Sequence, residues 1–178
     1  MATPMKYILD TNVAVTANRD ISQEGILDDE LACISNCIEV IQKIIKSNNL
    51  VLDAGDEIFK EYARHLNLSG VPGVGDIFFK WLHDHRWSFP EEDRVQITPN
   101  PNKGYEEFPD HPALDKFDPS DRKFIAVANK HPCHPMIYQA ADSKWWIWKT
   151  SLKEVGICVK FVCPDYIKRK CHGKFGKL

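Results

Sequence analysis

Hydrophobic positions along the chain recur with two different spacings, and each spacing predicts one kind of element. Between residues 30 and 47, apolar side chains return at every third or fourth position, which predicts an amphipathic helix. Similar stripes, or helix start and stop residues, predict further helices over 56–66, 76–87, 119–131 and 145–155. Short unbroken apolar runs predict buried strands at 6–9, 50–53, 136–141 and 157–163.

The alternation of these elements predicts the fold class. Short buried strands that are followed by helices are typical of α/β proteins, in which helices cover both faces of a mostly parallel sheet. We therefore expect a three-layer α/β/α arrangement around a central sheet. The sequence has no internal repeat and no linker that would divide it, so we expect a single domain over residues 1–165.

A stretch in the middle of the chain departs from this pattern. Residues 88–119 hold six of the eleven prolines together with many acidic residues, and include a candidate strand at 94–98. A connection of this length in a compact domain is usually a lid, a binding loop or a flexible insert. We therefore expect 88–119 to be an insertion into the domain.

The composition fits a globular domain whose charge is unevenly spread. Hydrophobic residues make up 43% of the 178 residues and charged residues 27%, which is enough to build a core. The formal net charge is −2, but residues 149–178 carry eight Lys or Arg against two acids, a balance of +6, which leaves −8 for the rest. We therefore expect a basic C-terminal tail at 166–178, which is either a solvated end or a phosphate-binding segment.

Nothing in the sequence indicates export or a membrane. The start lacks a charged segment followed by a long apolar one, and no apolar run approaches membrane-spanning length. We therefore expect a cytoplasmic protein whose six cysteines are mostly reduced. Cys33 and Cys37 share a helix face, where free cysteines usually act as small core hydrophobes. The other cysteines and the histidines near them match no strong zinc signature.

Four acidic residues are expected to converge on one edge of the sheet. Asp10 and Asp142 each follow a predicted strand, and ligands of such sheets lie outside the carboxyl ends of the strands. Asp121, in the first turn of its helix, and Glu61, midway along another, should lean toward the same edge. Singly, each acid is explained as a helix cap or a surface charge. Together they would repel one another, so we expect a cation, and oxygen-only donors favour Mg²⁺ or Mn²⁺.

The segments around these acids are ILDTN at Asp10, KEYARHL at Glu61, FDPSDRKFIAVA at Asp121 and AADSKWW at Asp142. In residue types, order and rough spacing they resemble the four motifs of the PIN-domain nucleases, and the resemblance spans residues 5 to about 163. The fourth segment departs from the family, because alanines at 140 and 141 replace the usual Thr-Gly or Ser-Gly before the aspartate. That change removes a hydroxyl which often lies beside the acid.

The resemblance implies a metal-dependent endoribonuclease. Asp10, Glu61, Asp121 and Asp142 would hold one or two Mg²⁺ or Mn²⁺ ions, and Asn12 would orient Asp10 or a metal-bound water. Attack by that water on RNA would leave a 5′-phosphate and a 3′-hydroxyl. Asp118, three residues before Asp121, is interpreted as the cap of its turn.

The resemblance also bears on partners. Many small PIN proteins are toxins held in check by an antitoxin and many dimerise, so the resemblance implies an RNA substrate and makes an antitoxin and a second copy of the chain candidate partners, although the sequence itself shows neither. The alternative is a non-catalytic PIN-like module that binds RNA or a protein. The basic residues expected to contact phosphate are Arg122 and Lys144, near the acids, and Lys168, Arg169 and Lys170 in the tail.

Three tryptophans cluster after Asp142. Trp145, Trp146 and Trp148 cannot all share one stripe of a helix, so we expect two of them to pack in the core and one to be partly exposed. An exposed tryptophan is a surface on which a nucleic-acid base stacks.

Overall fold

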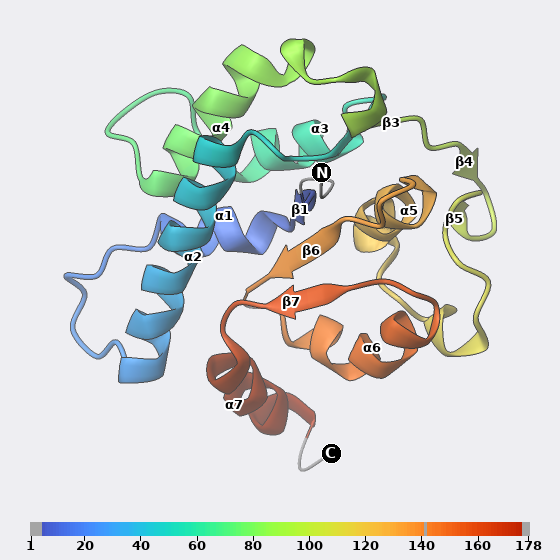
Figure 1. The fold of residues 1–178 in the computed structure, drawn as a ribbon. Helices are drawn as coiled ribbons and strands as arrows, with labels where there is room; N and C mark the ends of the chain where they lie inside the picture. The colour runs from blue at the N-terminus through green and yellow to red at the C-terminus, as the bar shows by residue number, and fades with distance from the viewer. Residues whose placement is uncertain (1–4, 141, 176–178) are drawn as a thin grey trace.

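The first strand, β1 (Tyr7–Leu9), ends at Asp10 and is followed at once by helix α1 (Thr11–Ala17). The computed structural model describes residues 5–140 and 142–175, and Figure 1 shows an α/β fold, as the alternation of elements predicts. The later elements are α2 (Asp28–Ser47), β2 (Leu52–Asp53), α3 (Glu57–His65), α4 (Val74–His85), β3 (Arg94–Val95), β4 (Pro99–Asn100), β5 (Gly104–Tyr105), α5 (Arg122–Lys130), β6 (Met136–Gln139), α6 (Ser143–Glu154), β7 (Val159–Phe161) and α7 (Pro164–Phe175). Short 3₁₀ turns are η1 (Arg86–Ser88), η2 (Glu91–Asp93), η3 (Pro112–Leu114) and η4 (Pro119–Asp121).

The main sheet is small and parallel. Its strand order is β1-β6-β7, and Tyr7 lies opposite Met136 in the register of the first pair. A second parallel pair, β2-β3, reaches the main sheet through a bridge between Tyr7 and Leu50, where the Val51 amide donates to the Tyr7 carbonyl at 2.8 Å. Because all these strands run the same way, their carboxyl ends share one edge of the sheet.

Helix α2 is the clearest amphipathic element, as its spacing predicts. Ile34, Ile41 and Ile44 are fully buried on one face. Three acids open its first turn, where the helix dipole favours negative charge, and Asn48 ends it in the left-handed conformation at φ 51°. The observed helix begins two residues before the predicted range of 30–47 and ends at the same residue.

Close packing fixes the position of α1. A side chain at Gly75 of α4 would begin 2.1 Å from the backbone oxygen of Ala14, so only glycine permits this approach of the two helices. From another side, the buried hydroxyl of Tyr62 in α3 donates to the carbonyl of Leu9. The start of α1 is thus held between α3 and α4, and with it Asp10.

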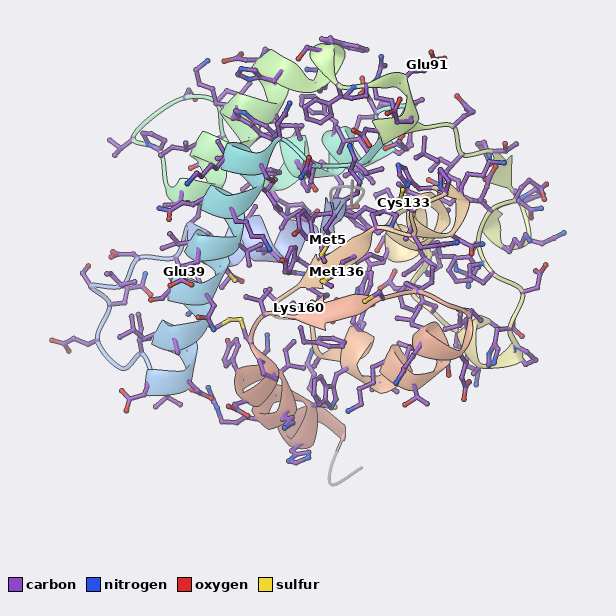
Figure 2. All side chains as sticks on the ribbon, in the orientation of Figure 1. Met5, Glu39, Glu91, Cys133, Met136 and Lys160 are labelled. Carbon is purple, nitrogen blue, oxygen red and sulfur yellow. A yellow bond between two sulfur atoms is a disulfide. The ribbon has the colours of Figure 1, made fainter. Side chains whose placement is uncertain are left out.

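A disulfide joins two distant parts of the chain. Cys33 in α2 is bonded to Cys163, just before α7, over a sequence separation of 130 residues (Figure 2). The interpretation of Cys33 as a free core cysteine is therefore wrong, although its burial on the face shared with Cys37 is confirmed. The other four cysteines are free, so most of the six are reduced as expected.

The C-terminal segment is a docked helix up to residue 175. Helix α7 buries Ile167 and Cys171 completely and packs against α2 and α6. This buried face was not predicted from the sequence, because the helix is rich in lysine and only a few of its positions are apolar. The predicted tail at 166–178 is therefore helical over most of its length, and 176–178 lie outside the described residues.

The insertion at 88–119 folds back onto the domain. It contains β3 and the antiparallel pair β4-β5, and it runs past α5 and α6 in Figure 1. Phe108, Leu114 and Phe117 are buried in the common core, and the Asn129 side chain donates to the carbonyl of Glu107 at 2.8 Å. The strand predicted at 94–98 is confirmed over its first two residues.

Membrane crossing needs a long, apolar helix. Within the described ranges, none of the helices combines that length with that composition.

Candidate active site

Asp10 follows β1 and caps the first turn of α1. Its Oδ1 accepts from the backbone amide of Asn12 at 3.0 Å and from the side-chain amide of Gln139, at the end of β6, at 3.4 Å. The residue is only 1% exposed. Burial raises the pKa of Asp10 well above its usual value, and the charges of Asp121 and Glu61 add to the rise. Asp10 is therefore both a helix cap and a buried acid that is difficult to ionise without a cation.

Glu61 reaches the same place from the middle of α3. Its Oε1 accepts from the hydroxyl of Thr11 at 2.9 Å, and its other oxygen forms an ion pair with the Lys123 ammonium. Both side chains of this pair are largely buried, at 13% exposed for Glu61 and 9% for Lys123. An ammonium group from α5 therefore compensates Glu61 in the described structure.

Asp121 lies where η4 meets α5. The indole Nε1 of Trp145, in α6, donates to its Oδ2 at 2.9 Å. Burial raises the pKa of Asp121 to about 6, the Trp145 hydrogen bond opposes the rise, and the charges of Asp142, Asp118 and Glu61 increase it. Asp121 is therefore close to its own titration point at neutral pH.

Asp142 caps α6, because its Oδ1 accepts from the Lys144 amide at 2.8 Å. The neighbouring Asp118 caps η4, as expected, by accepting from the Ser120 amide at 3.0 Å. A hydrogen bond from the Lys144 ammonium, at 2.8 Å, lowers the pKa of Asp118 to about 2. Asp142 is thus the half-buried outer member of the group, and Asp118 is a surface acid with its own counter-charge.

The four predicted acids, which we call the acidic rim (Asp10, Glu61, Asp121 and Asp142), lie close enough that their charges raise the pKa of Asp10 and Asp121. Asp10 responds to Glu61 and Asp121, and Asp121 responds to Glu61 and Asp142. Their oxygens are not all drawn to ligand distance, however. Among the described residues, the only group whose three or more donor atoms lie within 4.8 Å of one another is Cys33, Cys37 and Cys163. Two of these sulfurs form the Cys33–Cys163 disulfide, so the group has no set of thiolates with which to bind a metal.

Comparison with known proteins assigns no relative to this arrangement. No protein-family model matches the chain, and neither a curated protein nor a solved structure matches it. The chemistry of the acidic rim is therefore argued from its own geometry.

The prediction that Arg122 contacts phosphate is not supported by its position. Arg122 is 7% exposed, and its guanidinium donates to the carbonyls of Phe117 at 3.2 Å and of Asp115 at 2.6 Å. It also lies over the ring of Phe108, 4.8 Å from the centroid. All of these contacts belong to the insertion, so Arg122 anchors that segment through its guanidinium.

The other predicted basic residues lie nearer to solvent. Lys144 is exposed at the start of α6 and pairs with Asp118, while Arg169 is paired with Asp29 through contacts of 2.7 and 3.0 Å. Lys168 lies 3.9 Å from Asp165. Burial lowers the pKa of Lys170 and the charge of Lys174 lowers it further, while the charge of Asp142 acts in the opposite direction. The Lys170 ammonium lies 5.3 Å from the centroid of the Tyr166 ring.

Four residues of the site were missed from the sequence. Thr11 and Lys123 both contact Glu61, and Trp145 contacts Asp121, but each of these contacts joins elements that are remote in sequence. Gln139 donates to Asp10, while its own Oε1 has no hydrogen-bond partner among the described residues. Thr11 could have been predicted as a site residue, because it belongs to the ILDTN segment. The others carry no local signal, because their roles arise only when α5, α6 and β6 meet β1.

Proposed function

We propose that the protein is a metal-dependent endoribonuclease with a PIN-like, three-layer fold. The acidic rim is its active site, Mg²⁺ or Mn²⁺ its cofactor and RNA its substrate. The parallel strands with a common carboxyl edge, and the helices that bring Glu61 and Asp121 to that edge, support this proposal. An antitoxin partner and a homodimer stay predictions from the resemblance, and a cytoplasmic location stays a prediction from the absence of export and membrane signals in the sequence.

The observation that carries the proposal is the mutual electrostatic cost of the rim. Burial and neighbouring carboxylates raise the pKa of Asp10 and Asp121 in the absence of an ion. Natural proteins keep such an arrangement where a bound cation or catalysis requires it. Lys123 pairs with Glu61, and the charge of Asp142 acts on Lys144. Among the described residues, Asp10 and Asp121 form no ion pair with a basic side chain.

The donor set fits a hard divalent ion. All four rim residues offer carboxylate oxygens, the ligand type that Mg²⁺ and Mn²⁺ prefer. The unpartnered Oε1 of Gln139, buried beside Asp10, is an acceptor of the kind that a hydrated ion satisfies through its water. When bound, the ion would lower the pKa of a water and neutralise charge that develops on the phosphate.

The chain's own residues have distinct roles in this scheme. The Asn12 amide and Gln139 hold the carboxylate of Asp10, and Trp145 holds that of Asp121, so two of the ligands are oriented by hydrogen bonds. Thr11 and Lys123 hold Glu61. Such supporting contacts fix ligand orientation, which is as important for a metal site as the ligands themselves.

Two observations favour a second function. The Lys123–Glu61 pair supplies a cation from within the chain, and the rim oxygens do not form a compact ligand group. Both features are compatible with a PIN-like module that binds RNA or a protein without cutting. A titration separates the two: in the nuclease, Mn²⁺ raises the melting temperature, and Asp10→Asn and Asp142→Asn each remove that rise.

Cleavage is tested on a mixed RNA pool with and without Mn²⁺, and the product ends are mapped. We expect cuts with 5′-phosphate and 3′-hydroxyl ends from the wild type, and none from Glu61→Gln or Asp142→Asn. Glu57→Gln is the matched control, because Glu57 lies one turn earlier in α3 and pairs with Lys60 at the surface. Loss of cutting in Glu57→Gln, or cutting without metal, would contradict the proposal.

A further inference from the structure

A tryptophan on the surface of α6 lies between two hollows. One hollow of about 370 Å³ is lined by Trp146, Ile147, Lys149, Lys168 and His172. The other, of about 600 Å³, lies along α6 and β7, and its lining includes Trp146, Lys149, Lys153 and Phe161. Both volumes fall within the range of roughly 300–1,000 Å³ that is common for ligand pockets. Trp146 and Lys149 belong to both hollows and so form the ridge between them.

The ring of Trp146 contacts one aromatic ring and lies near two lysine ammonium groups. Phe161 of β7 contacts it edge to face, with centroids 5.0 Å apart and planes at 71°. The ammonium of Lys149 lies 3.7 Å from the ring centroid and that of Lys168 5.7 Å from it. Lysine side chains, and not buried apolar residues, therefore lie over the ring. A planar ligand can contact the ring when a lysine side chain moves off it to pair with an anionic group of the ligand.

The neighbouring tryptophans do not share this position. Trp145 is 1% exposed and its indole nitrogen is used by Asp121. Trp148 donates to the carbonyl of Ala113 at 2.9 Å and packs edge to face on Phe117. Trp145 is therefore a core tryptophan, as the spacing predicts, whereas Trp148 is half-buried against the core and Trp146 is half-buried beside the hollows.

The charge of the hollows selects for an anion. Lys149, Lys153 and Lys168 all line them, and none of the described lining residues is acidic. A stacking ring flanked by lysines is how proteins bind single-stranded nucleic acid, because bases stack on the ring while phosphates meet the ammonium groups. An acidic peptide would satisfy the charges but offers no regular series of planar groups to the ring.

The position of the ring relative to the acidic rim gives it a role. Trp146 comes four residues after Asp142, which is one helical turn and about 6 Å along the axis of α6. A strand whose phosphate lies at Asp142 therefore continues along α6 with a neighbouring base over Trp146.

We propose that Trp146, Lys149, Lys153 and Lys168 form a binding groove for single-stranded RNA, in which Trp146 stacks on a base beside the cleavage site. This inference rests on the proposed function, because it takes RNA as the ligand. Duplex RNA is excluded from the stacking step, since its bases are already stacked within the helix.

Binding is tested without cleavage by keeping EDTA in the buffer. A fluorescein-labelled 12-nucleotide oligouridylate is titrated with the full chain, and its anisotropy is followed. We expect Trp146→Ala to weaken binding by about tenfold, within the range measured for loss of one stacked base, and Trp146→Phe by less than about threefold. Trp87→Ala is the matched control, because Trp87 is 60% exposed and also lies against two arginines.

The lysines are tested through the salt dependence of the same titration. The double variant Lys149→Ala/Lys153→Ala should reduce the slope of log affinity against log salt by about 1.4, or 0.7 for each lost phosphate contact. The control pair is Lys46→Ala/Lys130→Ala, two exposed lysines on α2 and α5 that do not line the hollows. An unchanged slope in the first pair, or an equal change in both, overturns the groove.

Further outcomes separate this proposal from the nuclease. Binding that ignores Trp146→Ala while Mn²⁺-dependent cleavage persists refutes the groove and leaves the enzyme. Binding that requires Trp146 in a protein that cuts no RNA supports the groove and removes the enzyme. Equal loss in Trp87→Ala, or competition by polyglutamate as strong as that by RNA, also refutes the groove. Melting curves of each variant test whether it is folded, and Trp146→Phe is chosen because it keeps an aromatic ring beside Phe161.

Discussion

Asp121 illustrates how a single carboxyl group ties stability to pH. Its pKa of about 6 lies above the ordinary value of 3.8, so the folded protein binds this proton more tightly than the unfolded chain. As the pH rises from about 4 to 6, the unfolded state gives up its proton first, and the stability of the metal-free protein falls. At neutral pH the ionised, half-buried Asp121 therefore destabilises the metal-free fold.

This reasoning predicts that Asp121→Asn stabilises the metal-free protein at pH 7. The gain should be about 1–3 kcal/mol in the free energy of unfolding, because two pKa units correspond to nearly 3 kcal/mol and solvent screening reduces the effect. Below about pH 4 the gain should vanish. Urea unfolding in EDTA at both pH values measures it, and Asp110→Asn, at an exposed acid, is the control. A loss of stability at pH 7 would contradict the assigned electrostatics.

Lys123 gives a second prediction at the same scale. Lys123→Met leaves the largely buried Glu61 with only the Thr11 hydroxyl, so the metal-free protein should lose about 3 kcal/mol of stability. If Lys123 occupies the place of a cation, Mn²⁺ should then raise the melting temperature of the variant more than that of the wild type.

The control for Lys123 is Lys60→Met, which breaks the exposed Lys60–Glu57 pair on α3. Exposed pairs contribute little, so this variant should melt almost as the wild type does. Equal losses in the two variants, with the same response to Mn²⁺, would show that Lys123 has no special relation to the acidic rim.

At the scale of elements, α5 joins the site to the insertion. Asp121, at its start, belongs to the acidic rim, while Arg122, the next residue, donates to the carbonyls of Asp115 and Phe117. Arg122→Met should therefore cost about 2–3 kcal/mol of stability, because charged hydrogen bonds to buried carbonyls are lost. It should also speed proteolysis between residues 101 and 118. Arg64→Met, at an exposed position of α3, should change neither.

Elements with strong internal patterns were predictable from the sequence, and elements defined by contacts were not. Helix α2 repeats its isoleucines every three or four positions, so its existence and range follow from the pattern. Helix α1 has seven residues and a polar start, and α7 is rich in lysine, so neither carries a long enough apolar stripe. Their burial is decided by neighbours such as α4 and α6, which sequence spacing does not reveal.

The candidate site divides in the same way. Asp10 and Asp142 were predictable because acids at the ends of apolar strands must share an edge of a parallel sheet. The partners of the rim were not predictable. Lys123 pairs with Glu61 across 62 positions of sequence, from 123 to 61, and Trp145 donates to Asp121 across 24 positions, from 145 to 121. Arg122 was misjudged for the same reason: its charge was visible, but the carbonyls that engage it were not.

At the scale of the whole molecule, the Cys33–Cys163 disulfide closes most of the chain into one loop. Such a long loop restricts the unfolded state strongly, so reduction should cost about 2–5 kcal/mol of stability. Thermal melts with and without dithiothreitol measure this, and a Cys33→Ala/Cys163→Ala variant should be insensitive to the reductant. Identical melts of the wild type in both buffers would contradict a stabilising bond.

The remaining thiols provide a check on the same feature. Cys133 and Cys158 are exposed, whereas Cys37 and Cys171 are buried, and burial raises the pKa of the Cys37 thiol to about 12. Native protein without reductant should thus react with iodoacetamide at Cys133 and Cys158 and be spared elsewhere. Labelling of Cys33 or Cys163 by mass spectrometry would show that the two sulfurs are not joined.

The contact between Gly75 and Ala14 reaches further than its size indicates. Helix α4 contributes no acid to the rim, yet any side chain at position 75 has to push α1 aside, and α1 begins where Asp10 ends the first strand. In a saturation mutagenesis screen for the proposed nuclease activity, position 75 should therefore be as intolerant as the rim itself, although glycine has no side-chain group that could take part in catalysis. Selection would preserve the absence of a side chain at this position.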